Sequence, residues 1–144
     1  LTTAALTVTV RELPWGEYAA ALEASLALGL AQGRAAQLQR QQLERLLKMQ
    51  MANQPKEEQY GLGCRLAKVQ LELAEYAAAE QTLAELTARW PVRETPWLLR
   101  LRSAAARKDG AELARWLAEM ERAQVYLSAA GRREVDFWKG GGQP

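Results

Sequence analysis

The side chains of this chain that could do chemistry are carboxylates, arginines, lysines and one thiol, because its 144 residues include no histidine and a single cysteine, Cys64. Without histidine, neither a Ser-His-Asp nor a Cys-His nucleophile can form, and histidine-containing zinc sites are excluded. One cysteine allows neither an intramolecular disulfide nor a CxxC site. A lone helical cysteine is typical of a small buried apolar residue, and a reactive thiol is the alternative.

The carboxylates do not form a recognisable catalytic pair. Glu57 and Glu58 are adjacent, so their side chains diverge on a helix and cannot act together as acid and base. A di-iron carboxylate bundle requires His ligands that are absent here. No glycine-rich loop follows a predicted strand, so no nucleotide cradle is visible. We therefore predict a protein that is not an enzyme and holds neither cofactor nor metal, with carboxylate-only catalysis as the alternative left open.

The charge balance indicates the kind of partner. The 19 Lys and Arg residues are interspersed with 17 Asp and Glu, for a formal net charge of +2. Nucleic-acid binding needs a concentrated basic surface, so a generic nucleic-acid binder is not expected. A nucleic-acid-binding or regulatory helical domain is kept as an alternative because of one local basic strip. That strip consists of Arg100, Arg102, Arg107 and Lys108.

The elements that must position these side chains are predicted to be helices. Hydrophobic residues make up 49% of the chain and charged residues 25%, the balance of a soluble globular domain. Apolar residues recur at spacings of three and four between Pro and Gly breaks, which is the helical pattern. The predicted helices cover residues 14–30, 35–52, 56–73, 76–89, 96–108, 111–126 and 132–138.

Caps and breaks set the predicted boundaries. Thr95 is a candidate cap with Pro96 at the first helical position. Asp109 or Gly110 is predicted to cap the next helix, and Gly131 to break the chain before the last one.

The length predicts one domain, over residues 14–138. Residues 1–10 are apolar and β-branched but about half as long as a membrane helix. Residues 1–13 are therefore predicted to be a lead-in segment, and the end of a removed or truncated hydrophobic segment is the alternative. This segment itself is not expected to cross a membrane, although a membrane-tethered full-length protein fits the same sequence. Glycine-rich residues 139–144 are predicted to be a flexible tail.

The stretch Leu66 to Pro91, LAKVQLELAEYAAAEQTLAELTARWP, resembles a tetratricopeptide repeat (TPR). The matching positions are Leu66 and Ala67 for the family's Leu-Gly, Ala74 for its inter-helix Gly, Tyr76 for the aromatic that opens the second helix, Ala79 for the small contact residue, and Pro91 for the closing proline. The sequence departs from the family at Leu83, which replaces an aromatic, and at Leu86, which replaces Ala. Small residues at the contact let two helices cross closely.

A more degenerate unit follows at the same period. Counting 34 residues on from Gly63 reaches Trp97, where the family has its first-helix Trp, while the same step from Ala79 reaches Leu113. The first hairpin, 15–52, matches only in length and helical character. The resemblance implies an all-α fold of antiparallel helical hairpins stacked as a short TPR-like solenoid, and a compact helical bundle is the alternative.

The resemblance also implies a binding surface, because the first helix of each hairpin would line a concave groove for an extended or helical peptide. The residues predicted to bind the partner there are Cys64, Arg65, Lys68, Glu72, Arg93, Leu98 and Arg102. Arg65, Lys68 and Arg102 could pair with an acidic partner, and a solvated basic edge is the alternative for each. The Lys and Asn that clamp a C-terminal carboxylate in some TPR domains are replaced by Cys64 and Lys68, so that function is not implied.

We therefore predict a scaffold or adaptor domain that binds another protein or a peptide segment. The Ala, Leu and Arg bias is typical of a GC-rich bacterial genome, where such domains often belong to secretion, pilus or exopolysaccharide machinery. The sequence is compatible with the bacterial cytoplasm and with the cell envelope. Self-association into a homo-oligomer is a further alternative.

Overall fold

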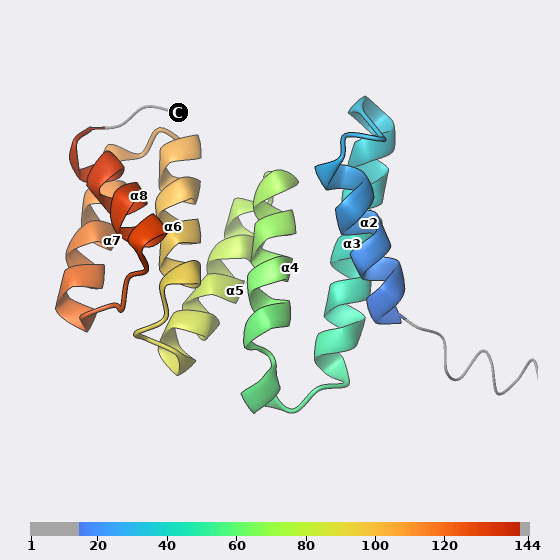
Figure 1. Ribbon diagram of the computed structural model, residues 1–144, viewed down its shortest axis with the longest axis horizontal. Helices are drawn as coiled ribbons and strands as arrows, with labels where there is room; N and C mark the ends of the chain where they lie inside the picture. Colours follow the sequence, from blue (N-terminus) through green and yellow to red (C-terminus); the bar gives the residue numbers. More distant parts are fainter. Residues whose placement is uncertain (1–14, 142–144) are drawn as a thin grey trace, which may run out of the picture. The chain divides into compact units, whose positions relative to one another are not determined.

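The computed structural model describes residues 15–141, and this part of the chain is all-helical (Figure 1). Its elements are α2 (Trp15–Ala27), α3 (Gly33–Ala52), a 3₁₀ turn η1 (Lys56–Glu58), α4 (Tyr60–Glu72), α5 (Tyr76–Arg89), α6 (Glu94–Ala106), α7 (Gly110–Ala123) and α8 (Ala129–Lys139). Residues 15–141 contain no strand, and one isolated parallel bridge joins Arg93 to Tyr126. The predicted all-α class is confirmed. The predicted lead-in, residues 1–13, and residues 142–144 of the predicted tail lie outside the described residues.

Backbone contacts divide the described residues into two compact units, one up to residue 53 and one from residue 54 onward. The single domain predicted over residues 14–138 stays a prediction. The first unit contains the hairpin of α2 and α3, joined by a turn in which Gly29 has a positive φ of 69°. Ser25 donates from its hydroxyl to the side-chain oxygen of Gln39 over 3.2 Å and links the two helices. The buried apolar residues of this unit are Ala19, Ala36, Leu43, Leu46 and Leu47.

In the second unit, α4 and α6 are followed by the same kind of left-handed turn, and the two turns lie 34 residues apart. Ala74 follows α4 with a φ of 58°, and Lys108 follows α6 with a φ of 56°. The amide of Ala74 donates to the carbonyl of Leu71, and the amide of Lys108 donates to that of Ala105, both over 3.0 Å. These bonds satisfy carbonyls that a helix end would otherwise leave without partners. The helices keep the same period, since α4 and α6 begin at residues 60 and 94, and α5 and α7 at 76 and 110.

α6 is the central element of this unit, because its side chains enter two apolar clusters. On one side, Leu99 joins a cluster with Ala67 of α4 and with Leu83 and Leu86 of α5. On the other side, α6 packs with α7 and α8. That second cluster contains Trp97, Leu98, Leu101, Ala104, Trp116, Met120, Val135 and Trp138. α6 is therefore fixed from both sides, and the side chains on its remaining surface are held in place.

α3, α4, α6 and α8 begin two to four residues away from their predicted starts. The helix expected near Lys56 begins at Tyr60, and Lys56–Glu58 form a separate 3₁₀ turn with hydrogen bonds between residues three apart. α6 begins at Glu94 with Arg93 as its cap residue, so Thr95 is not the cap and Pro96 lies two positions further in than expected for a first-position proline. Proline is tolerated there because the first four amides of a helix have no intrahelical partner.

The predictions made at Asp109 and Gly131 have opposite outcomes. Asp109 caps α7 as predicted, since its carboxylate accepts from the amide of Glu112 over 3.0 Å. The break predicted at Gly131 is wrong, because Gly131 lies in the first turn of α8. Ser128 caps that helix, and its hydroxyl accepts from the amide of Gly131 over 3.0 Å.

Candidate functional site

A hollow of about 270 Å³ opens beside α4 and α6, the first helices of the two hairpins in the second unit. We call it the α4–α6 groove. Its lining residues are Lys68, Leu71 and Glu72 of α4, Tyr76 of α5, and Leu99, Arg102, Ser103 and Ala106 of α6. Three of the sequence-predicted partner-binding residues, Lys68, Glu72 and Arg102, therefore line one groove.

The floor of the groove is apolar and continuous with the core. Leu99 is 3% exposed and belongs to the cluster shared by α4, α5 and α6. Leu71 is half-buried and packs against the same cluster. Tyr76 contributes its half-buried ring at the start of α5. A floor held by core packing is preorganised, so a bound apolar side chain would not have to order it.

The rim of the groove is charged. Lys68 and Glu72 are exposed and stand four residues apart on α4, which places them on one face of the helix. Neither side chain makes an ion pair within residues 15–141. Both charges are therefore available to a partner.

Arg102, on the α6 side of the rim, is oriented by α8. Its guanidinium donates two hydrogen bonds to the carboxylate of Glu134, over 2.7 and 2.8 Å. Trp138 also donates to Glu134 from its indole nitrogen, over 3.2 Å. The hydrogen bonds from Arg102 hold the pKa of the Glu134 carboxyl below its usual value. The Arg102 side chain remains 50% exposed, so its position is fixed while part of it faces the solvent.

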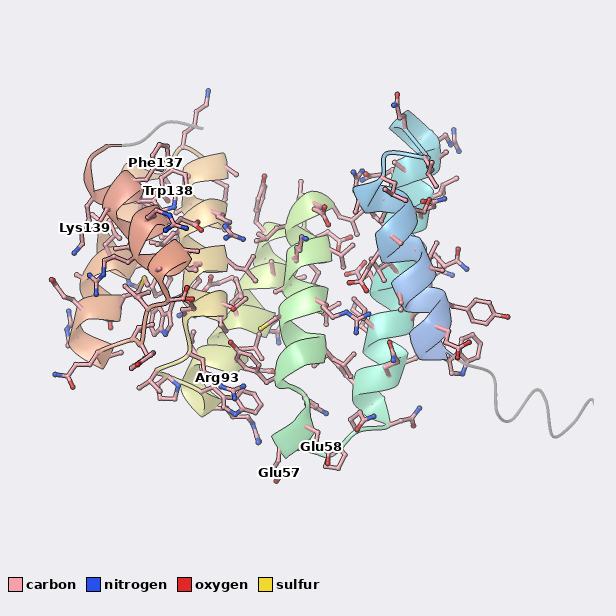
Figure 2. The ribbon with its side chains drawn as sticks, viewed as in Figure 1. Glu57, Glu58, Arg93, Phe137, Trp138 and Lys139 are labelled. Atoms are coloured by element: carbon pink, nitrogen blue, oxygen red, sulfur yellow. The ribbon has the colours of Figure 1, made fainter. Side chains whose placement is uncertain are left out.

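Cys64 and Arg93 lie together at a different place, near the start of α4. The Arg93 guanidinium stacks on the ring of Tyr60 at 4.3 Å, and that ring meets Trp90 edge-on at 5.3 Å. Cys64 is half-buried, and burial raises the pKa of its thiol. A protonated thiol is a poor nucleophile, so Cys64 is packed rather than activated. Figure 2 shows Arg93 at the same end of the second unit as Glu57 and Glu58.

The other two predicted residues do not line the groove. Leu98 is 7% exposed and belongs to the cluster that joins α6 to α7 and α8. Its neighbour Leu99 faces the groove instead. Arg65 is half-buried on α4 and is not among the lining residues.

Sequence reasoning missed the floor of the groove. The missed residues are Leu71, Tyr76, Leu99, Ser103 and Ala106. Most of them carry a signal, because Leu99, Arg102, Ser103 and Ala106 follow the spacing of three, four and seven that marks one face of a helix. Leu71 stands three residues after Lys68 and shares its face in the same way. Leu98 was predicted for this face of α6 instead, and it belongs to the core.

The predicted basic strip is largely neutralised. Arg100 is 6% exposed and donates to Glu80 over 2.8 Å. Arg107 pairs with Glu112 over 2.7 Å. With Arg102 bound to Glu134, three of the four side chains in the strip already have carboxylate partners. A strip of this kind offers little charge for phosphate contacts.

The described residues show no arrangement that suggests metal or membrane chemistry. Residues 15–141 hold no group of three or more His, Cys, Asp or Glu side chains that could bind a metal ion. No helix in this range is long and apolar enough to span a bilayer. Comparisons with protein-family models, curated proteins and solved structures found no match for this chain.

Proposed function

We propose that this chain is a non-enzymatic, TPR-like interaction module that holds a segment of a partner protein in the α4–α6 groove. One observation carries the proposal. The groove is lined by α4 and α6, the equivalent first helices of two hairpins, which begin 34 residues apart. Its floor is apolar and joined to the core, and its rim is charged. A small apolar pocket ringed by polar groups is the usual form of a site that anchors a peptide side chain.

The TPR-like interpretation is supported by burial at the positions that carry the resemblance. Ala67 and Ala79 are fully buried, as expected where two helices cross closely. Leu83 and Leu86 are buried beside them. Ala74 has the left-handed backbone conformation for which the family uses glycine. The 34-residue spacing of the two turns, at Ala74 and Lys108, supports the same interpretation.

Binding can be tested by selecting phage-displayed random peptides on the full chain and measuring the affinity of enriched peptides by fluorescence anisotropy. The decisive variant is Ala106→Trp, which would place an indole over the groove from the exposed end of α6. Loss of a central apolar anchor typically costs 2 kcal/mol or more, so we expect Ala106→Trp to weaken binding by about tenfold or more.

The matched control is Ala84→Trp, at an exposed alanine of α5 outside the groove. It should leave peptide affinity within about twofold, because it adds the same side chain elsewhere. Enrichment of no peptide, or equal affinity for the wild-type chain and Ala106→Trp, would contradict the proposal.

The alternative functions gain less support. Nucleic-acid binding is disfavoured because Arg100, Arg102 and Arg107 already pair with carboxylates. Self-association and membership of a larger bacterial assembly stay predictions.

A further inference from the structure

The two rim charges on α4, Lys68 and Glu72, stand in an order that disfavours an ion pair between them. In α3, Glu44 precedes Lys48 by four residues, and the two side chains form an ion pair at 3.4 Å. In α4 the order is reversed, with Lys68 preceding Glu72. This order is the less favourable one for pairing within a helix. Consistent with this, Lys68 and Glu72 form no ion pair with each other or with another of residues 15–141.

The two charges also stand in a fixed relation to the floor. Four residues along a helix correspond to about 6 Å. Leu71 lies between Lys68 and Glu72 in sequence, and all three line the groove. A segment that covers the floor would therefore pass a positive charge on one side and a negative charge on the other.

We propose that the partner segment carries one large apolar residue flanked by an acidic residue on one side and a basic residue on the other. The apolar side chain enters the groove over Leu71 and Leu99. The acidic residue pairs with Lys68, and the basic residue pairs with Glu72. This inference rests on the proposed function, since it names the chemistry of the segment that the groove takes.

Arg102 plays a lesser part in this selection. Its charge is opposed by Glu134 through two hydrogen bonds, so the pair presents almost no net charge to a partner. Lys68 and Glu72 are the rim charges with no such compensation among the described residues. A purely acidic segment would meet repulsion at Glu72, and a purely basic one at Lys68.

The test uses peptides enriched by phage display on the wild-type chain. We expect them to share an apolar residue with an acid and a base on opposite sides. Lys68→Glu should then weaken binding by about three- to tenfold, and replacing the acidic residue of the peptide by Lys should restore it. Glu72→Lys should behave in the same way toward a peptide whose basic residue is replaced by Glu. The losses should shrink at high salt, because both pairs are exposed.

Two variants control for net charge. Lys56→Glu in η1 and Glu85→Lys on α5 make the same charge changes at exposed residues outside the groove. They should change affinity by less than about twofold.

The outcomes separate the two proposals. Enriched peptides that are blocked by Ala106→Trp but show no charge pattern, or whose losses no reciprocal peptide change restores, would overturn this inference and leave the proposed function standing. Peptides insensitive to Ala106→Trp, or no enrichment at all, would overturn both.

Discussion

The carboxylate of Glu94, in the first turn of α6, fills the space beside Gly131 where any other residue would carry its Cβ. The same carboxylate accepts hydrogen bonds from the amide and the hydroxyl of Ser128, over 2.8 to 2.9 Å. Ser128 is the cap residue of α8. Glu94 thereby ties the start of α8 to the start of α6, and this contact requires glycine at position 131.

A double-mutant cycle at these two residues should show strong coupling. In the wild-type background, Gly131→Ala pushes the Glu94 carboxylate away from Ser128 and should lower stability. In the Glu94→Ala background the space is open, and Gly131→Ala should stabilise the helix by about 0.5–1 kcal/mol. We expect a coupling energy of about 1–2 kcal/mol from urea denaturation. Equal effects of Gly131→Ala in the two backgrounds would show that the contact is not formed.

Gly61 and Gly63 of α4 differ in the space that each leaves for a Cβ. A Cβ at Gly63 would lie 2.7 Å from a methyl carbon of Leu86, whereas a Cβ at Gly61 meets nothing within 4 Å. Gly63→Ala should therefore lower the free energy of unfolding by about 1–2 kcal/mol, because the buried Leu86 side chain or the two helices must shift to make room. Gly61→Ala should raise it by about 0.4–1 kcal/mol. Denaturant titrations of the two variants test this, and a stabilising Gly63→Ala would rule out the close helix approach.

The left-handed turn at Ala74 should tolerate glycine better than alanine. Its φ of 58° strains any residue that carries a Cβ. Ala74→Gly should therefore stabilise the second unit by about 0.5–1 kcal/mol. Ala77→Gly, at an exposed position inside α5, should destabilise it by a similar amount. Thermal denaturation distinguishes the two signs, and destabilisation by both variants would contradict the turn geometry.

The buried Arg100 predicts an asymmetric response to mutation. Arg100 lies 4.1 Å from the ring centre of Trp116, and burial lowers the pKa of its guanidinium while Glu80 opposes that shift. Glu80→Gln would leave a buried charge without its partner and should cost about 1–3 kcal/mol, below the fully buried case because Glu80 is 38% exposed. Arg100→Met lets Glu80 rehydrate and should cost about 1 kcal/mol or less. A larger loss for Arg100→Met in urea denaturation would contradict this account.

Local signals predicted much of the fold. The bounds of α5, Tyr76–Arg89, and the cap at Asp109 follow from residues adjacent in sequence, and both predictions are confirmed. Gly131 was misinterpreted because a glycine commonly marks a break between helices. Within α8 it lies against the carboxylate of Glu94, 37 residues away, and no local pattern contains that contact.

The candidate site was predictable to a similar extent. Lys68, Glu72 and Arg102 followed from the repeat register, because exposed charges on a first helix stand out in sequence. The sequence does not indicate which of Leu98 and Leu99 faces the groove. α6 is buried on two sides and apolar around most of its circumference, so its rotation depends on α7 and α8 rather than on its own periodicity.

The pair of Arg102 and Glu134 predicts a loss of stability in acid. The hydrogen bonds from Arg102 hold the pKa of Glu134 below that of an unfolded glutamate, roughly 4.3. The unfolded chain therefore takes up the proton first, so the contribution of the pair is fully present above that value and is lost as the pH falls through the lower folded pKa.

Between about pH 5 and pH 3, the wild-type chain should lose more stability than Glu134→Gln, by an amount typical of a partly exposed pair, about 0.2–1 kcal/mol. Urea denaturation at each pH measures the difference. Glu85→Gln, which removes an exposed carboxylate of α5, is the control for the change in net charge. Parallel curves for the wild-type chain and Glu134→Gln would show that Arg102 does not stabilise the ionised form of Glu134.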